Sequence, residues 1–270
     1  MSEILRIQHC YNAGDLISIM AGLQKIYQDT GKKSAIFQRL NLPSYYFDGQ
    51  INSTLDKDGN SVCMNEQMFY MLKPLIESQE YVDSFNIWQG EETDWDYELT
   101  RDSKSIPMPA GTIHSWYEAV FPQTSTDLSR QWIEVESGSI NSEKYINKVL
   151  INRSQRYQNP YITYYFFKKY ESSLLFSGTE TEHQNFCSTW NLDIEHLKVD
   201  NFYQLAQVIK WCKFGIYNQS VNFHIADAIK RPRVLELCAA FPNTFITGAN
   251  GYQFYRQAAL EFYTDKLMNQ

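Results

Sequence analysis

Three consecutive polar residues, Asn218, Gln219 and Ser220, interrupt an apolar part of the chain in a way that suits phosphate binding. The residues before them, FGIY, predict a buried strand, and the residues after them, VNFHIADA, predict a helix. At such a junction, backbone N–H groups and small hydroxyls face a phosphorylated ligand. His224, one helical turn after Ser220, either points into the same site or is a buried core histidine. The turn therefore predicts a nucleotide-type site.

Two arginines, Arg153 and Arg156, flank a serine in the loop that follows the strand-like run KVLIN. Arginine binds diphosphate oxygens in a bidentate manner and stabilises negative charge on a leaving nucleoside diphosphate. The alternative is a pair of solvated loop arginines. We expect at least one of the two to contact phosphate.

Two more predicted strands end in residues that suit a nucleotide. Gly178 and Thr179 follow SSLLFS, where glycine allows close approach and threonine supplies a hydroxyl and an N–H. Glu182 lies three residues after Thr179, which is also the spacing of a helix capping box, so a structural role is the alternative. Glu236 ends the strand-like run RPRVLE and is a candidate to bind a ribose diol.

Motifs for metals and common cofactors are missing from the sequence. It contains no HxH, HExxH or Cys/His cluster, and Asp94-Trp95-Asp96 matches a manganese-binding DxD motif by letters only. We therefore expect no metal. The absence of a Walker P-loop and of GxGxxG argues against kinases and NAD enzymes.

These residues need strands and helices that alternate along the chain. The first 40 residues predict a strand at 4–9, a helix that stops at Gly31, and a second strand at 34–40. The stretch 145–255 predicts five strands separated by helices, with a Pro/Asn/Gly-rich tail at its end. Between them, a helix interrupted at Pro74, a strand near 82–89, an acidic surface loop at 91–103 and a proline-bounded loop are harder to place.

The predicted fold class is α/β, with two Rossmann-like doubly wound domains that face each other across a cleft. Residues 1–140 form the first domain, residues 141–255 the second, and residues 256–270 a terminal helix that packs back.

Composition limits the partners and the compartment. The net charge of −7, with no run of four basic residues, disfavours nucleic acid as a partner. Five scattered cysteines without a CxxC pair are typical of reduced thiols in the cytoplasm. No basic, apolar leader and no apolar run of 18 residues is present, so we expect neither export nor a membrane span.

Three stretches together resemble one family. They are HCYNAGDLISIMAGLQ, LINRSQRYQN followed by FSGTETEH, and IYNQSVNFHIADAIKRPRVLE. The chain resembles glycosyltransferases of the GT-B fold, most of all the heptosyltransferase type and its phage or surface-polysaccharide relatives. It departs from them at Val221, because the family usually has glycine after the serine of the turn.

The resemblance implies a metal-independent, inverting transfer of a sugar from a nucleotide-sugar donor. It gives Asp15 the role of the base that deprotonates the acceptor hydroxyl, and it puts Gly14 and His9 on the acceptor side. For Asp15, a helix N-cap is the structural alternative. The acceptor is a saccharide, a lipid-linked glycan or, less favoured by charge, a nucleic acid.

Two other functions stay open. One is a binding or structural protein that kept the fold and lost the reaction, which is compatible with Val221. The other is a nucleotide-sugar epimerase, which needs more acid and base residues than the sequence offers.

Overall fold

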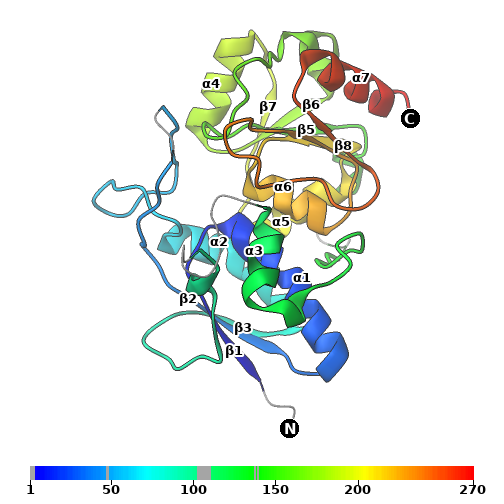
Figure 1. The fold of residues 1–270 in the computed structure, drawn as a ribbon. Helices are drawn as coiled ribbons and strands as arrows, with labels where there is room; N and C mark the ends of the chain where they lie inside the picture. Colours follow the sequence, from blue (N-terminus) through cyan, green and yellow to red (C-terminus); the bar gives the residue numbers. More distant parts are fainter. Residues whose placement is uncertain (1–3, 47–48, 102–110, 137, 139) are drawn as a thin grey trace.

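The computed structural model describes residues 4–46, 49–101, 111–136, 138 and 140–270. These residues form two parallel β-sheets with helices around and between them (Figure 1). The first sheet contains β1 (Leu5–His9), β2 (Ser34–Gln38), β3 (Val82–Ile87) and β4 (Trp95–Asp96). The second contains β5 (Val149–Asn152), β6 (Leu174–Ser177), β7 (Glu195–Leu197), β8 (Phe214–Tyr217), β9 (Arg233–Glu236) and β10 (Gly251–Phe254).

The strand order is that of nucleotide-binding folds. The first sheet has the order β3-β2-β1-β4, and the second has the order β10-β9-β8-β5-β6-β7. Counted within its own half, each sheet starts 3-2-1-4, and the second continues with 5 and 6, the Rossmann order. The predicted α/β class is confirmed. The order reverses between β1 and β4 and between β5 and β8, and ligands bind beyond the carboxyl ends of strands at such points.

The central strands of the second sheet are apolar because helices cover the sheet. Every residue of β5, β6, β8 and β9 is buried. Continuous burial with Val, Leu, Ile and Phe is typical of parallel strands packed on both faces.

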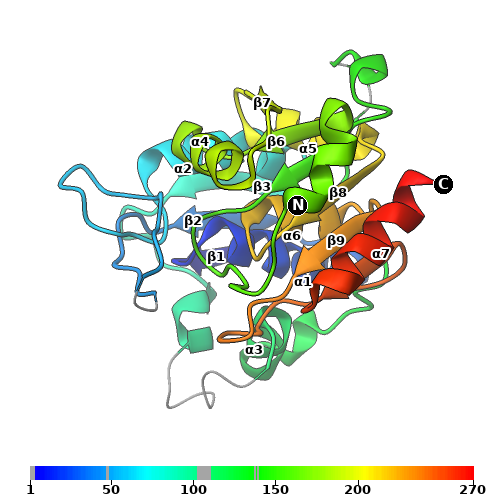
Figure 2. The ribbon, with the colours of Figure 1, turned by 90° about the horizontal axis from the view of Figure 1, so that it is seen from above.

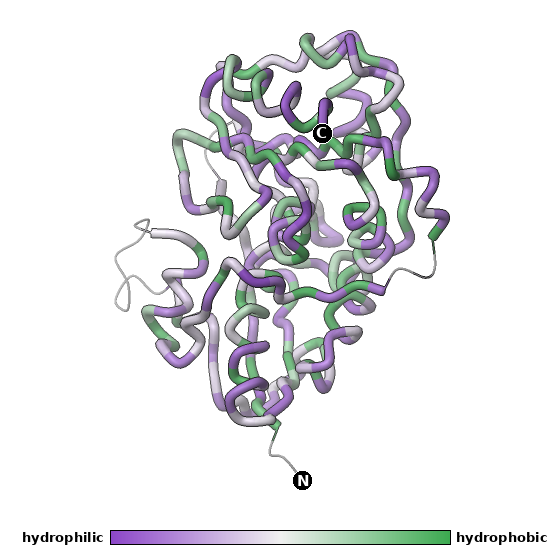
Figure 3. The backbone as a smooth tube through the Cα atoms, turned by 90° about the vertical axis from the view of Figure 1, so that its right-hand side faces the viewer, coloured by the Kyte–Doolittle hydropathy of each residue, from purple (hydrophilic) through white to green (hydrophobic). Residues whose placement is uncertain are grey.

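Helices join the two halves. The helices are α1 (Ala13–Thr30), α2 (Glu66–Glu77), α3 (Ile113–Val120), α4 (Glu180–Trp190), α5 (Phe202–Trp211), α6 (Val221–Ala228) and α7 (Gln257–Met268). Between the sheets, α1 packs against α6 and α2 packs against α5 (Figure 1). One buried hydrophobic cluster therefore contains Ile17 of the first half and Phe223 of the second. Figure 3 shows hydrophobic stretches in both halves and in the helices between them.

The terminal helix packs on its own half. Helix α7 lies against β9 and β10 (Figure 2). The domain division at residue 140 stays a prediction.

Some predicted elements differ from the observed ones. The stretch after Glu92 is not a solvent loop, since it forms β4 and the 3₁₀ helix η1 (Tyr97–Arg101), with Tyr97 fully buried. Helix α2 continues through Pro74. Between β5 and β6, the aromatic run at 161–170, where the alternation predicts a helix, contains the start of a 3₁₀ helix, η4 (Tyr165–Ser173), and the tail contains β10. Two further short 3₁₀ helices are η2 (Pro122–Thr124) and η3 (Ser142–Lys144), and residues 102–110 lie outside the described part.

Candidate functional site

A cavity of about 60 Å³ lies where the two halves meet, beyond the carboxyl ends of the strands at both reversal points. Asp15 follows β1, Arg101 follows β4, Arg156 follows β5 and Ser220 follows β8. All four line the cavity, as do the predicted site residues Gly14, Gln219 and His224. Segments far apart in the sequence therefore meet at the place where the topology predicts a ligand.

Asp15 is a buried carboxylate in the first turn of α1. The N-cap of this helix is Asn12, so the alternative of Asp15 as the cap is wrong. Arg101 forms an ion pair with Oδ1 of Asp15, and the Tyr117 hydroxyl donates to the same oxygen at 3.1 Å. These two donors hold the carboxylate in a fixed orientation.

Arg101 is a site residue that sequence reasoning missed. Its guanidinium carbon lies 4.3 Å from the ring centroid of Tyr11 and 5.4 Å from that of Trp116. The only signal in the sequence is a single cation at the end of an acidic stretch, which the motif search does not weigh.

Gly14 lets α1 approach His224 closely. A Cβ atom at Gly14 would lie 2.5 Å from Cδ2 of the imidazole, so a larger residue would displace the ring or the helix. The Nδ1 atom of His224 lies 3.1 Å from the Ser18 hydroxyl. Burial is the main cause that lowers the pKa of His224 to about 3, and the ring is therefore neutral near pH 7.

In the Asn218–Ser220 turn, two side chains bond to the protein itself and the third faces the cavity. Asn218 donates to the backbone oxygens of Ser154 and Arg156, at 3.1 and 2.7 Å. Gln219 donates to the Asn243 side chain at 2.6 Å. The Ser220 hydroxyl has no hydrogen-bond partner within the described part of the chain, and Ser220 lines the cavity. Of the three side chains, Ser220 is the one free to bind a ligand.

Arg156 connects the two halves. It donates to the Tyr46 hydroxyl at 3.0 Å and also to the Asn52 side chain, and its guanidinium carbon lies 5.1 Å from the Tyr46 ring centroid. Together with Arg101 it makes the cavity a basic site around one carboxylate.

Arg153 and Glu236 bind each other. Nε and Nη2 of Arg153 each lie 2.8 Å from a carboxylate oxygen of Glu236, and both residues are buried. The Tyr164 hydroxyl and the Asn159 N–H also donate to Glu236, at 2.7 and 2.6 Å. The predicted ribose contact of Glu236 has no free oxygen to support it in this arrangement.

Three other predicted residues lie away from the cavity lining. Thr179 forms the capping box with Glu182, with bonds of 2.8 and 3.2 Å, and Gly178 immediately precedes it. His9 is fully buried, and its Nδ1 lies 2.7 Å from Oε1 of Gln38. Their functional roles stay predictions.

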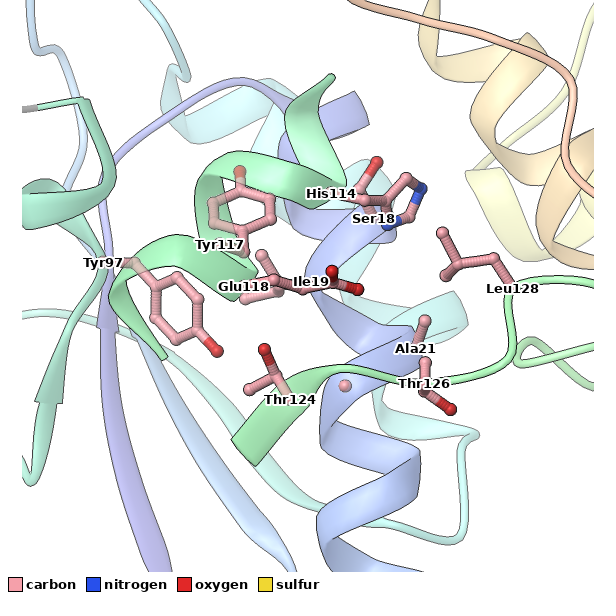
Figure 4. Close-up of a pocket in the computed structure, with 11 residues that line it drawn as sticks. Ser18, Ile19, Ala21, Tyr97, His114, Tyr117, Glu118, Thr124, Thr126 and Leu128 are labelled. Carbon is pink, nitrogen blue, oxygen red and sulfur yellow. The ribbon is translucent and has the colours of Figure 1, made fainter. Parts of the chain in front are cut away.

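The loop at 153–160 separates this cavity from a larger pocket. That pocket has a volume of about 440 Å³ and is lined by residues that include Arg153, Gln155, Phe186 and Trp190. A third cavity, between α1 and α3, measures about 10 Å³, which holds about one water molecule. Figure 4 shows it, with Tyr97 and Tyr117 on one side and Leu128 on the other.

A cluster of possible metal ligands lies outside these cavities. Ligand atoms of Glu180, His183 and His196 lie within 4.8 Å of one another. The spacing of the three residues matches none of the metal motifs searched for in the sequence, so this cluster was missed.

Neither the family models nor the curated proteins contain a match to this sequence. Solved structures do match. A glycosyl transferase family 9 protein from Veillonella parvula has a TM-score of 0.57 at 11% identity, covering 100% of this chain and 91% of that one. The ADP-heptose lipopolysaccharide heptosyltransferase II of E. coli has a TM-score of 0.60 at 10% identity, with 99% of each chain covered. This chain has the fold of those glycosyltransferases.

The predicted resemblance is thereby confirmed at the level of the fold. A third similar structure is the dodecameric, iron-containing glycosyltransferase TibC of enterotoxigenic E. coli, with a TM-score of 0.55 and 11% identity. It covers 92% of this chain and 61% of TibC. Within the described residues, none of the helices combines the length and the apolar character that a membrane span requires.

Proposed function

We propose that this protein is a glycosyltransferase that moves a sugar from a nucleotide-sugar donor to a hydroxyl acceptor, with inversion at the anomeric carbon. The observation that carries the proposal is the meeting of Asp15, Arg101, Arg156 and Ser220 in one cavity at two topological reversal points. The fold supports it, since similar structures include a heptosyltransferase described with ADP and with an ADP-heptose analogue.

Each residue has a task in such a reaction. Asp15 is the base that removes the proton of the acceptor hydroxyl as it attacks. Arg156 and the Ser220 hydroxyl bind the diphosphate at the start of α6, where the helix dipole also favours negative charge. Arg101 competes with the acceptor for Asp15, so the acceptor has to displace its guanidinium or share the carboxylate with it.

The donor needs more room than the cavity gives. A volume of about 60 Å³ is far below the roughly 300 Å³ or more of typical ligand sites. The 440 Å³ pocket across the 153–160 loop is large enough for a nucleoside, and Trp190 and Phe186 offer aromatic faces to a base. We therefore place the nucleoside there and the reacting sugar near Asp15, on either side of the 153–160 loop that carries Arg156.

The charges at the site take the place of a cation. Arg156, the Ser220 hydroxyl and the start of α6 stabilise the leaving diphosphate, so transfer needs no metal at the reacting centre. The described cysteines Cys10, Cys63, Cys187, Cys212 and Cys238 are free thiols, which supports a reducing compartment such as the cytoplasm. The acidic net charge favours a saccharide or lipid-linked acceptor over a nucleic acid.

A donor screen tests the proposal. The protein is incubated with UDP-, GDP-, ADP- and CMP-sugars, while thermal stabilisation and nucleotide release are measured. We expect one donor class to raise the Tm and to be hydrolysed or transferred. Asp15→Asn should lower the rate by roughly 10²- to 10⁴-fold and leave donor binding in place. Asp29→Asn, an exposed residue on the same helix, is the matched control.

The outcomes separate the alternatives. Neither stabilisation nor release with any donor would contradict the glycosyltransferase proposal. Stabilisation without release would favour the binding protein that has lost the reaction, an alternative that the Arg101–Asp15 ion pair and Val221 support. Full activity of Asp15→Asn would remove only the assignment of the base.

A further inference from the structure

A small group of polar side chains lies at the edge of the second sheet, where α4 meets β7. The two elements lie side by side in Figures 1 and 2. Glu180 and His183 are one turn apart on the same face of α4, and His196 lies on β7. The two imidazole rings are stacked, with centroids 4.6 Å apart and planes 10° from parallel.

The hydrogen bonds of the two rings fix which nitrogen carries the proton. Nε2 of His183 lies 2.9 Å from the backbone oxygen of Ile194, and Nε2 of His196 lies 2.9 Å from that of Gly178. A carbonyl oxygen only accepts, so both Nε2 atoms are donors. In a neutral ring with the proton on Nε2, Nδ1 carries no proton and offers a lone pair.

Those lone pairs lack suitable partners. Nδ1 of His183 is buried and has no hydrogen-bond partner anywhere in the described residues. Nδ1 of His196 lies 3.2 Å from Oε2 of Glu180, which is itself an acceptor. With both rings neutral, neither Nδ1 atom therefore faces a hydrogen-bond donor in the described residues, whereas Oε2 of Glu180 is also contacted by Lys198.

We propose that Glu180, His183 and His196 bind one divalent transition-metal ion of the zinc class, with water completing the coordination. Histidines that bind metal typically donate their second ring nitrogen to a backbone carbonyl, as both do here. Two imidazoles with one carboxylate suit zinc, cobalt, nickel and iron(II) better than magnesium or calcium, which prefer oxygen ligands only. Two ligands of one tetrahedral zinc lie about 3.3 Å apart, close to the 3.2 Å between His196 and Glu180.

Binding requires two local changes. Lone pairs of parallel rings do not converge, so one imidazole has to rotate toward the other. Lys198, whose Nζ lies 3.2 Å from Oε2 of Glu180, has to leave that oxygen. The second change is available, because Glu180 and Lys198 have largely exposed side chains, 55% and 77%.

The site is independent of the transfer chemistry. It ties the edge strand β7 to the first turn of α4, so the expected effect of the metal is on stability. The test uses the full chain without a histidine tag, stripped with a chelator and titrated with Zn²⁺ or Co²⁺. We expect one ion per chain, visible absorption bands of tetrahedral Co²⁺, and a Tm increase of about 5 °C at 100-fold excess over Kd.

Variants identify the ligands. Glu180→Gln and His196→Gln should each weaken binding at least about 10-fold. Glu180→Gln changes an exposed side chain and is expected to fold. Glu195→Gln, an exposed glutamate next to His196, is the matched control and should bind like the parent, while Lys198→Met should bind as well or better. No saturable binding, binding of equal strength in Glu180→Gln and His196→Gln, or stabilisation by Mg²⁺ to the same extent would each overturn the proposal.

Discussion

Three histidines, of which His9 and His224 are buried and His114 is half-buried, determine how this protein responds to acid. Burial is the main cause that lowers the pKa of His9 and of His114 to about 4, and that of His224 to about 3. Each is neutral in the folded protein across the physiological range. The ring of His224 therefore lines the cavity as a neutral imidazole and not as a cation.

Acid should destabilise the protein well before its carboxylates are protonated. In the unfolded chain, histidine takes up a proton near its ordinary pKa of 6.5, whereas in the folded protein these rings resist protonation down to about pH 4. Above pH 6.5 neither state is protonated, and stability is unaffected. As the pH falls from about 6.5 to 4, each ring should remove about 1.4 kcal/mol of unfolding free energy per pH unit.

The measurement is urea unfolding at several pH values. The His9→Gln variant should show a shallower dependence than the parent between pH 6.5 and 4, whatever its stability at pH 7.5. Equal slopes in the two proteins would show that His9 is protonated in the folded state.

A buried ion pair connects the carboxyl ends of two strands of the second sheet, β5 and β9. Arg153 follows β5, Glu236 ends β9, and the pair also binds the segment at 159–164. This contact shapes the 153–160 loop, which forms a wall of both the small cavity and the larger pocket. We interpret the pair as positioning the loop that carries Arg156.

Glu236→Gln should lower the unfolding free energy by about 3 kcal/mol or more, because it leaves the buried Arg153 charge without a partner. The double variant Arg153→Met/Glu236→Gln should regain part of that loss. Glu195→Gln breaks the exposed pair with Lys144, whose side chains are 49% and 44% exposed, and should cost at most about 1 kcal/mol. Urea unfolding provides the comparison, and equal losses in the two single variants would contradict this account.

Strands were predictable where a run of buried residues is apolar throughout. VLIN, LLFS and FGIY are apolar between polar loops, and each forms the expected strand. β4 has only two residues and lies in an acidic stretch, so its pattern predicts a loop. Arg101 could not be predicted as a site residue for the same reason, because it reaches Asp15 only when β4 pairs with β1. The Arg153–Glu236 pair joins residues 83 apart, which no local pattern encodes.

The two halves of the molecule are not independent bodies joined only by a linker. The hydrophobic cluster that contains Ile17 and Phe223 crosses from one half to the other through α1 and α6. A shared core of this kind couples the unfolding of the parts that contribute to it.

Unfolding should therefore occur in a single transition, with calorimetry and tryptophan fluorescence giving the same midpoint. Phe223→Ala, at a side chain only 1% exposed, should lower the unfolding free energy by about 3 to 5 kcal/mol and keep the single transition. Two separate transitions in the parent protein would show instead that each half folds on its own.

The strand order also means that β1 is synthesised long before one of its two partner strands. β1 lies inside its sheet, and its partner β4 arrives late, since Gln8 bonds to Asp96, 88 residues further on. At roughly 5 to 20 residues per second, a ribosome needs about 4 to 18 seconds to make that stretch. During this interval the nascent chain carries one unpaired edge of its first strand, so that edge is where a chaperone, or a neighbouring nascent chain, first meets this protein.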